Sequence, residues 1–293
     1  MTDRPRRGPW LPLALLTLGL LGAPAVAEEP APTEPPVAPA EGAAPRGWQI
    51  APEFGRPEIF RAGAFSRAAD ECRPAFDLWI RGGWAWCATG TIDSAGVTIR
   101  VSRFDPGEKQ WRAPVDEPRF AGFDAADPFI TADGSRLYFS GRPRRGAGQG
   151  QGFDIWETHR NGSGWSEPVR LPAAVNGPAH EASPWETANG TLYFTSDRPG
   201  GRGDRDVYRC RRVDGVYQPA ENVAAVNTPS RELDLCVDAG ERWLVVTSDR
   251  PGGQGGLDLW AAVADSAGGW GAPRDVDPPL NGPADDFAPV IWA

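Results

Sequence analysis

The chain aligns with itself, and this internal repeat limits its fold more than any other feature. A motif in which an acidic residue is followed three positions later by proline occurs at 71–74, 181–184 and 286–289, with variants at 125–128 and 232–235. The prolines or their equivalents lie 51 to 56 residues apart. A regular period of this size is typical of repeat architectures, in which each repeat forms one supersecondary unit.

A second motif, aromatic-x-x-Pro, keeps the same period and ends each unit. It occurs at 54–57, 111–114, 165–168 and 270–273. Between the two motifs, alternating apolar segments such as 192–194 flank Asn-Gly or Asp-Gly pairs, which supply the positive φ of tight hairpin turns. Four short strands in about 50 residues predict one blade of a β-propeller.

Composition agrees with an all-β fold. Gly (36) and Pro (31) make up 67 of 293 residues, against a usual combined share of roughly 12 %. Because both residues interrupt helices, this even spread excludes helical bundles and doubly wound α/β folds.

The repeat predicts four complete four-stranded units and a thin fifth blade divided between the two ends of the chain. Residues 48–60 carry the motif of a fourth strand, and residues 286–292 carry that of a first strand. Pairing them would close the ring and cover its edges. The alternative is a four-bladed ring with both ends packed outside it.

The N-terminus predicts export. Three arginines precede an apolar run at 10–21, which is too short to span a bilayer stably, and Ala25-Val26-Ala27 fits a cleavage site. We expect residues 1–27 to be a signal peptide, 28–46 a Pro/Ala/Glu-rich linker and 47–293 the propeller domain. The mature protein would then be periplasmic or secreted, with no membrane span.

Gly-rich loops carry a resemblance to a known family. Ser-Asp-Arg-Pro-Gly-Gly occurs at 196–201 and 248–253, each followed by an Asp-aliphatic-aromatic strand, and Asn-Thr-Pro at 227–229 precedes an acidic position. At these residues the chain resembles TolB-type, WD-repeat-like propeller repeats of the bacterial envelope, over residues 54–293. The resemblance implies an extracytoplasmic binding or scaffold protein.

First strands of propellers face the central channel, so the acidic motif positions should form a ring at one rim. These are the candidate ligand-binding residues Glu71, Glu181, Glu232 and Asp286. Asp127 and Asp234 would add carboxylates on the same strand faces. Such carboxylates suit Ca²⁺, a basic partner, or acid–base catalysis of glycoside hydrolysis.

A structural role for these carboxylates is the competing interpretation. Arg198 and Arg250 in the Gly-rich loops can pair with Glu181 and Glu232, or with Asp206 and Asp258. A loop present in every blade is expected to be structural, because one active site cannot occur in every repeat.

Other candidates occur in single units. Trp79, Trp84, Trp86 and Trp185 could stack on sugars or peptides, or pack between blades. Cys72, Cys87, Cys210 and Cys236 suit an oxidising compartment, and their order suggests Cys72–Cys87 and Cys210–Cys236 disulfides, with buried thiols as the alternative. His159 and His180 show neither metal-ligand spacing nor a catalytic triad pattern.

Charge limits the partners. The net charge is −9, and removal of residues 1–27, with three Arg and one Asp, makes it −11, which argues against nucleic acid. We therefore predict an exported, non-catalytic β-propeller that binds an envelope protein or a glycan and needs no cofactor, with a cation such as Ca²⁺ as the alternative for its carboxylates. The alternatives are a glycosidase or lyase-type enzyme at the channel mouth and a carbohydrate-binding module.

Overall fold

A computed structural model describes residues 16–17, 70–80, 84–93, 96–105, 107–144, 152–162 and 164–292. Regular structure in these residues is almost entirely β-strand, and the one helical element is the 3-10 helix η1 (Pro118–Phe120). None of the helical structure described is long and apolar enough to cross a membrane. The expectation of an all-β fold is confirmed.

Four antiparallel sheets follow one another along the chain, and we number them in that order. Sheet 1 contains β2 (Asp70–Ile80), β3 (Trp84–Asp93), β4 (Gly96–Asp105), β5 (Gln110–Trp111) and β6 (Val115–Asp116). Sheet 2 contains β7 (Phe123–Ile130), β8 (Arg136–Pro143), β9 (Asp154–Asn161), β10 (Gly164–Trp165) and β11 (Val169–Arg170).

Sheets 3 and 4 are the most regular copies. Sheet 3 contains β12 (Glu181–Glu186), β13 (Leu192–Ser196), β14 (Asp206–Cys210) and β17 (Glu221–Asn222), with a separate hairpin of β15 (Arg212–Val213) and β16 (Val216–Tyr217). Sheet 4 contains β18 (Glu232–Val237), β19 (Trp243–Ser248), β20 (Asp258–Val263) and β21 (Arg274–Asp275).

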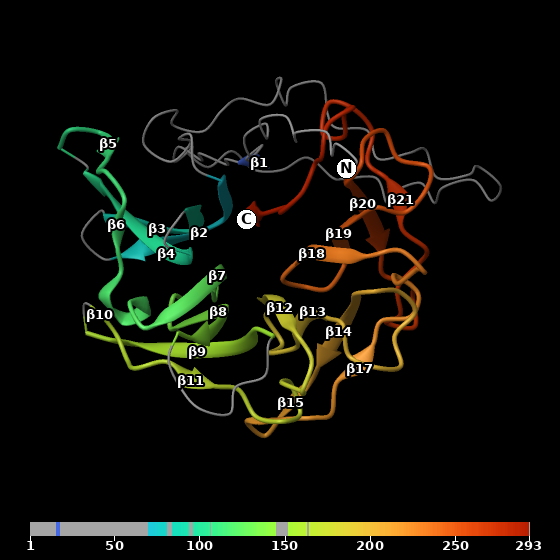
Figure 1. Cartoon of the computed structure of the whole chain (residues 1–293), viewed down its shortest axis with the longest axis horizontal. Helices are drawn as coiled ribbons and strands as arrows, with labels where there is room; N and C mark the ends of the chain where they lie inside the picture. The colour runs from blue at the N-terminus through green and yellow to red at the C-terminus, as the bar shows by residue number, and fades with distance from the viewer. Residues whose placement is uncertain are drawn as a thin grey trace, which may run out of the picture.

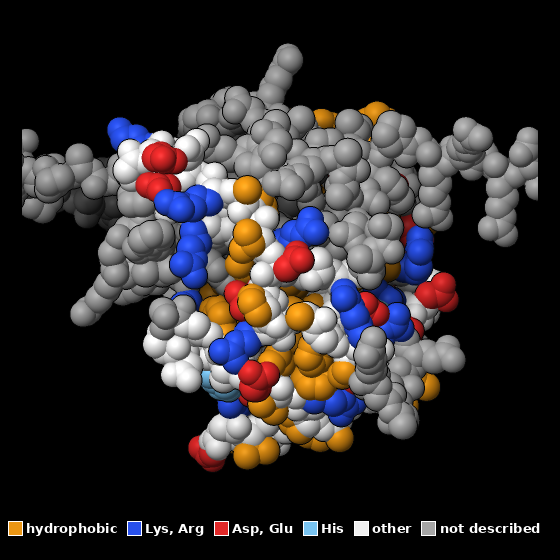
Figure 2. Space-filling model, turned by 60° about the vertical axis from the view of Figure 1, so that its left-hand side comes forward, with side chains coloured by type: hydrophobic (Ala, Val, Ile, Leu, Met, Phe, Trp, Pro, Cys, Tyr) orange, Lys and Arg blue, Asp and Glu red, His pale blue; other side chains and the backbone are white. Residues whose placement is uncertain are grey.

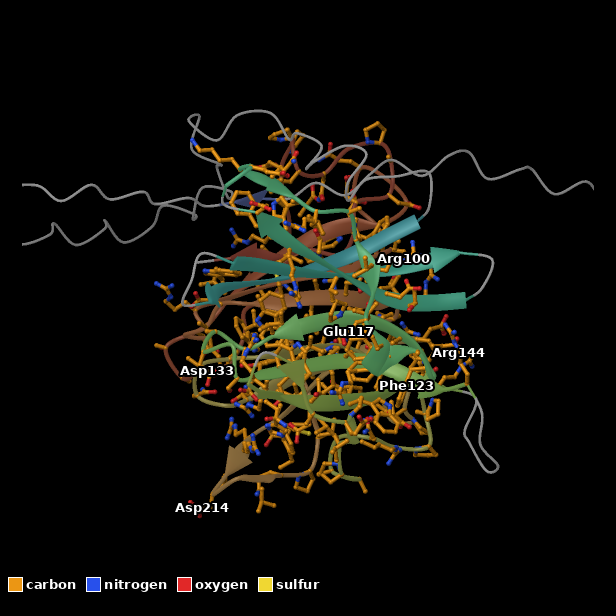
Figure 3. All side chains as sticks on the ribbon, turned by 90° about the vertical axis from the view of Figure 1, so that its left-hand side faces the viewer. Arg100, Glu117, Phe123, Asp133, Arg144 and Asp214 are labelled. Atoms are coloured by element: carbon orange, nitrogen blue, oxygen red, sulfur yellow. The ribbon has the colours of Figure 1, made fainter. Side chains whose placement is uncertain are left out.

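Figure 1 shows the four sheets arranged around a common centre, with the first strands β2, β7, β12 and β18 innermost. This is the four-bladed arrangement of a β-propeller. A side view separates its two faces (Figure 3): Asp133 and Asp214 lie in turns at one end of the strands, and Arg144, which follows β8, lies at the other. We call these the turn face and the loop face, because the Gly-rich loops lie on the second.

The predicted fifth blade is not confirmed. β22 (Ile291–Trp292) pairs in parallel with β1 (Leu16–Thr17), and the partner predicted for it, residues 48–60, lies outside the described residues. The preceding segment nevertheless continues the pattern of a first strand. The Asp286 amide donates to the Leu257 carbonyl at 2.7 Å, as the Glu232 amide does to Arg205 at 2.9 Å.

The acidic-x-x-Pro motif forms a β-bulge in the first strand of each sheet. Pairing with the second strand shifts register between Cys72 and Ala75, and the same shift occurs in the other sheets at 126–129, 182–185 and 232–235. A bulge bends the strand and redirects one side chain. The recurrent motif therefore determines which side chains turn toward the centre.

The core lies between the sheets and is built from the first, second and third strands together. In β8 and β13, six hydrophobic side chains are fully buried: Leu137, Tyr138, Phe139, Leu192, Tyr193 and Phe194. Neighbouring residues of a strand point to opposite faces, so burial of whole runs means that both faces of sheets 2 and 3 are covered. Each such side chain contributes about 1.5–3 kcal/mol of transfer free energy.

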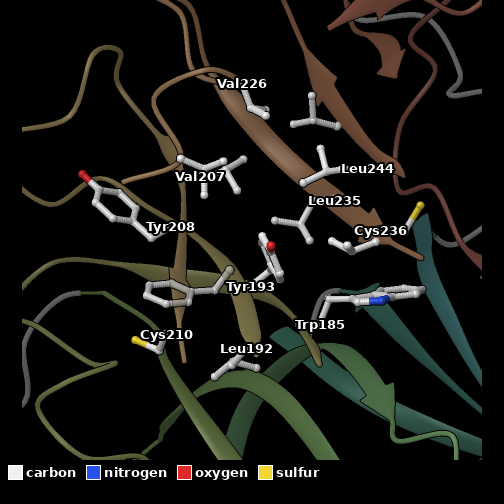
Figure 4. Packing of buried hydrophobic residues seen from close by; sticks show 14 of the residues in the cluster. Trp185, Leu192, Tyr193, Val207, Tyr208, Cys210, Val226, Leu235, Cys236 and Leu244 are labelled. Atoms are coloured by element: carbon white, nitrogen blue, oxygen red, sulfur yellow. The ribbon is translucent and has the colours of Figure 1, made fainter. Parts of the chain in front are cut away.

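Figure 4 shows this packing, which includes Cys210 and Cys236. The predicted disulfide between these two cysteines is wrong. No disulfide joins Cys210 and Cys236, the two cysteines whose side chains the structure describes. Cys210 ends β14 in sheet 3, and Cys236 lies in β18 of sheet 4. Both are buried, and burial raises the pKa of Cys210 to about 12. The predicted Cys210–Cys236 disulfide was based on the order of the cysteines along the chain, whereas their strands belong to different blades.

Candidate functional site

Glu181 and Glu232 begin the first strands of sheets 3 and 4 on the loop face, and both are completely buried. Arg198 contacts Glu181 at 3.0 Å, and Arg250 contacts Glu232 at 2.9 Å. Each guanidinium comes from the Gly-rich loop of the same sheet. These two carboxylates are therefore corrected from ligand candidates to structural groups, because no ligand can reach them.

Further donors form hydrogen bonds with each of these buried carboxylates. The hydroxyl of Ser196 donates to Glu181, and that of Ser248 donates to Glu232. The Gly177 and Thr228 amides, from the connection that precedes each strand, also donate to them. Burial raises the pKa of both carboxyls, against the opposing effect of the guanidinium and the other donors.

The acidic residues at the other rim positions differ from Glu181 and Glu232, because those that the structure describes are partly exposed. In sheet 2, Asp124 pairs with Arg142 and Arg144 at 3.1 and 3.0 Å. At the C-terminal copy, Asp286 accepts the Gly282 amide at 2.7 Å, and burial raises its pKa, as do Asp258 and Asp285 to a smaller extent. The side chain of Glu71 lies outside the described residues.

The Gly-rich loops hold neighbouring sheets together. A Cβ on Gly203 would lie 1.8 Å from the Ser230 carbonyl oxygen, and one on Gly255 would lie 1.9 Å from that of Ala284. Only glycine permits such close approach of two backbones. Asp206 and Asp258 accept amide bonds within these loops and do not pair with Arg198 and Arg250, which settles the open choice of partner.

A recurrent asparagine near the end of three units makes a structural contact with the third strand. Asn176, Asn227 and Asn281 each accept the amide and donate to the carbonyl of one residue in the third strand, at 2.8–2.9 Å. The recurrence of Asn at the end of each unit was the signal for this role. These bonds join the connection between two blades to the preceding blade.

A polar network lies at the bulges of three first strands. The Asp127 carboxylate accepts bonds from the Ser140 hydroxyl at 2.8 Å and the Ser183 amide at 3.2 Å. The Ser183 hydroxyl donates to the Asp234 carboxylate at 2.8 Å. We call Asp127, Ser140, Ser183 and Asp234 the channel network, since they connect β7, β12 and β18 at the centre of the ring.

The two carboxylates of the channel network differ from the rim carboxylates of sheets 3 and 4 in exposure, whereas Ser140 and Ser183 are buried. Asp127 and Asp234 are partly exposed, whereas Glu181 and Glu232 are completely buried. Asp127 has a φ of 50° and Ser183 a φ of 55°, a region that residues other than glycine occupy at a cost. Because one serine donates to both carboxylates, their nearest oxygens are at most about 10 Å apart.

The tryptophan candidates divide into two groups. Trp79 lies in β2, and Trp84 and Trp86 lie in β3, but their side chains are outside the described residues. Trp185 is buried, and its ring lies 4.7 Å from that of Phe129. Trp185 therefore packs between sheets 2 and 3, which corrects its assignment as a stacking residue for ligands.

The two histidines lie on opposite faces. His159 is exposed in β9, with its Nε2 atom 3.4 Å from Glu157. His180 precedes β12 on the loop face, and its Nδ1 atom accepts the Phe153 amide at 3.0 Å. Across the residues that the structure describes, His, Cys, Asp and Glu side chains do not gather in threes as metal ligands would.

Figure 2 shows acidic and basic side chains interspersed on one side of the molecule. Exposed ion pairs of the described residues include Arg119 with Glu167 and Arg100 with Asp116. Pairs this exposed contribute little stability.

Comparison with known proteins finds similar folds at low identity. No family model matches the chain, and no curated protein does. A protein described as TolB from Agrobacterium tumefaciens has a TM-score of 0.44 at 18 % identity, over 63 % of this chain and 58 % of that one. A Hadza microbial sialidase has a TM-score of 0.48 at 14 % identity, over 72 % and 48 %.

A third structure, the catalytic domain of the Coprinopsis cinerea GH62 α-L-arabinofuranosidase, has a TM-score of 0.43 at 13 % identity, over 76 % of this chain and 72 % of that one. The chain spans about half the length of the first two structures, at 58 % and 48 %. These similarities concern the fold alone, and they include both a TolB and glycoside hydrolases.

Proposed function

We propose that the protein is an exported, non-catalytic β-propeller of the cell envelope, periplasmic or secreted, that binds a partner protein or a glycan at the centre of its ring. One observation carries this proposal. The rim carboxylates of sheets 3 and 4 are completely buried and paired with arginines, whereas Asp127 and Asp234 of the channel network are partly exposed.

Variation among the repeats supports this location. At the rim, the motif begins with Glu or Asp in sheets 3 and 4 and in the C-terminal copy. Two positions further along, the side chain changes from copy to copy: Asp127, Ser183, Asp234 and Ala288. A position that varies among otherwise equal units is free of the common structural role and can serve recognition.

The chemistry of the network defines the groups it could bind. The carboxylate oxygens of Asp127 and Asp234 can accept hydrogen bonds from ammonium, guanidinium or sugar hydroxyl groups. A basic protein segment and a glycan both carry such donors. The TolB-type, WD-repeat-like resemblance of the loops at 196–201 and 248–253 favours a protein as the partner.

The test uses the tagged mature chain, residues 28–293, and an extract of the native envelope. The channel variant carries Asp127→Asn and Asp234→Asn, and the control carries Asp214→Asn and Glu167→Gln, which lie in an exposed turn and an exposed ion pair. Melting temperatures first establish that both variants fold. Capture lost only in the channel variant supports the proposal, and equal capture by both variants contradicts it.

Glycoside hydrolysis is the second candidate function. Asp127 and Asp234 bond to the same serine, and a separation of at most about 10 Å suits an acid–base pair of carboxylates. The mature chain would then release nitrophenol from aryl glycosides, and Asp127→Asn would remove this turnover. Hydrolysis that persists unchanged in the variant would contradict a catalytic role for the network.

A further inference from the structure

Among the described residues, sheet 2 meets sheet 3, sheet 3 meets sheet 4, and sheet 4 meets the C-terminal copy of the motif at the same place on the loop face. In each case the residue before the third strand of one unit accepts a backbone hydrogen bond from the acidic residue of the next copy of the motif. Backbone bonds of this kind join Glu181 to Phe153 at 2.8 Å, Glu232 to Arg205 at 2.9 Å, and Asp286 to Leu257 at 2.7 Å. The three junctions therefore share one backbone contact.

Two of the junctions add a second bond in the opposite direction. The Phe153 amide donates to Nδ1 of His180 at 3.0 Å, and the Leu257 amide donates to Oδ1 of Asp285 at 3.0 Å. His180 and Asp285 occupy equivalent positions, one residue before the acid of the motif. At the junction between them in the chain, Arg231 cannot accept such a bond and pairs with Asp249 at 2.8 Å.

The bond to His180 exists in one protonation state only. Nδ1 accepts the Phe153 amide, so it carries a lone pair and the proton of the neutral ring lies on Nε2. A second proton would have to occupy Nδ1, where it would face the amide hydrogen. Protonation of His180 and the Phe153 bond therefore exclude each other, whereas a carboxyl oxygen such as Oδ1 of Asp285 can accept a bond in either protonation state.

The charged groups around His180 come from four elements. Asp197 follows β13, Arg205 precedes β14, Asp127 lies in β7 and Arg142 lies in β8. Burial of the imidazole lowers the pKa of His180, and Arg205 and Arg142 act in the same direction, whereas Asp197 and Asp127 oppose them. The ring also stacks on Phe153 with centroids 5.3 Å apart.

We propose that His180 is a pH-sensitive contact between sheets 2 and 3, which holds the start of β9 against the start of β12 when the imidazole is neutral and releases the Phe153 amide when it is protonated. The backbone bond from Glu181 to Phe153 remains in both states, so the junction loosens locally and the ring stays folded. The equivalent junction at Asp285 and Leu257 stays closed over the same range of pH.

The direction of the effect follows from the lowered pKa. The folded chain binds the His180 proton less readily than the unfolded chain does, whose histidine pKa is about 6.5. The contact is thus complete above that value and is lost as the pH falls through the lower pKa of the folded protein. Acidification therefore loosens this junction through the loss of the Phe153 bond to His180.

The test is amide hydrogen exchange, measured by NMR on the mature chain between pH 8 and pH 5 and corrected for intrinsic exchange. Protection of the Phe153 amide should fall roughly fivefold as His180 is protonated, the value of one ordinary hydrogen bond. Protection of the Leu257 amide should stay constant. Phe153 protection that does not change with pH, or a parallel loss at Leu257, would overturn the proposal.

Two variants separate the contact from other acid effects. His180→Asn keeps an acceptor without a titrating ring, so Phe153 protection should become independent of pH, and a surviving pH dependence would contradict the role of His180. His159→Asn, at the exposed second histidine, should behave as the wild type does. If His180→Asn does not fold, the comparison of Phe153 with Leu257 in the wild-type chain still decides the question.

Discussion

Sheet 4 and the C-terminal copy of the motif begin with the same contacts and then diverge. In sheet 4, Glu232 is completely buried and paired with Arg250, and the strand β18 follows. In the C-terminal copy, the shorter Asp286 accepts the Gly282 amide, remains partly exposed, and begins a segment that pairs with no second strand among the described residues. The acid of the motif therefore becomes a buried structural group only where its own blade supplies the arginine.

The largest effect is expected at Arg250. Arg250→Met retains a long apolar stem but leaves Glu232 buried without its cation, and should lower the free energy of unfolding by about 3–5 kcal/mol. Arg119→Met is the control, because both side chains of its ion pair with Glu167 are exposed, at 41 % and 83 %, and such a pair should contribute less than about 1 kcal/mol. Urea denaturation measures both, and equal losses would show that the two pairs do not differ as their burial implies.

A comparison of Asn227 and Asn281 tests whether the C-terminal copy is held as firmly as sheet 4. Each asparagine is nearly fully buried and bonds both backbone groups of one third-strand residue. Alanine at either position leaves two backbone groups unsatisfied and should cost about 2–3 kcal/mol. A much smaller loss at Asn281, seen by thermal unfolding, would mean that residues 281–286 contribute little to the domain.

Gly203→Ala tests the contact between the Gly-rich loop of sheet 3 and the connection to sheet 4. The added Cβ would overlap the Ser230 carbonyl, so the backbone must move, at a cost of about 1–3 kcal/mol. Gly122→Ala is the matched change, since nothing lies within 4 Å of its added Cβ. Calorimetry should give a clear drop in melting temperature for the first variant only.

The smallest effect is expected at Asp286, and it depends on pH. Its raised pKa means that the folded chain binds this proton more tightly, so its contribution to stability is present below the unfolded pKa and is lost as the pH rises. Asp286→Asn should therefore change stability little near pH 3 and be slightly stabilising, by up to about 0.5 kcal/mol, near pH 6. Destabilisation by the variant at pH 6 would contradict this sign.

The internal repeat was enough to predict the four-stranded units and the structural role of the arginines in the Gly-rich loops. Loops present in several units predicted structural roles for Arg198 and Arg250, and both pair with the acid of their own sheet. The channel network was only half predicted, because Asp127 and Asp234 stood out as acids whereas Ser183, which donates to both, carried no local signal. The sequence left the role of Trp185 open between ligand stacking and packing between blades. An aromatic residue beside a proline shows the same local pattern whether its ring is buried or exposed.

The sequence by itself determined the unit, its four strands and the expectation that the loop arginine pairs with an acid of its own repeat, because all of these depend on residues within one repeat. The tertiary structure alone decided which side chains of different units meet. Ser183 lies between Asp127 and Asp234, and His180 lies beside Phe153, because the ring places the first strand of each sheet against the sheet before it. Contacts between units depend on curvature and register summed over whole blades, which no single repeat specifies.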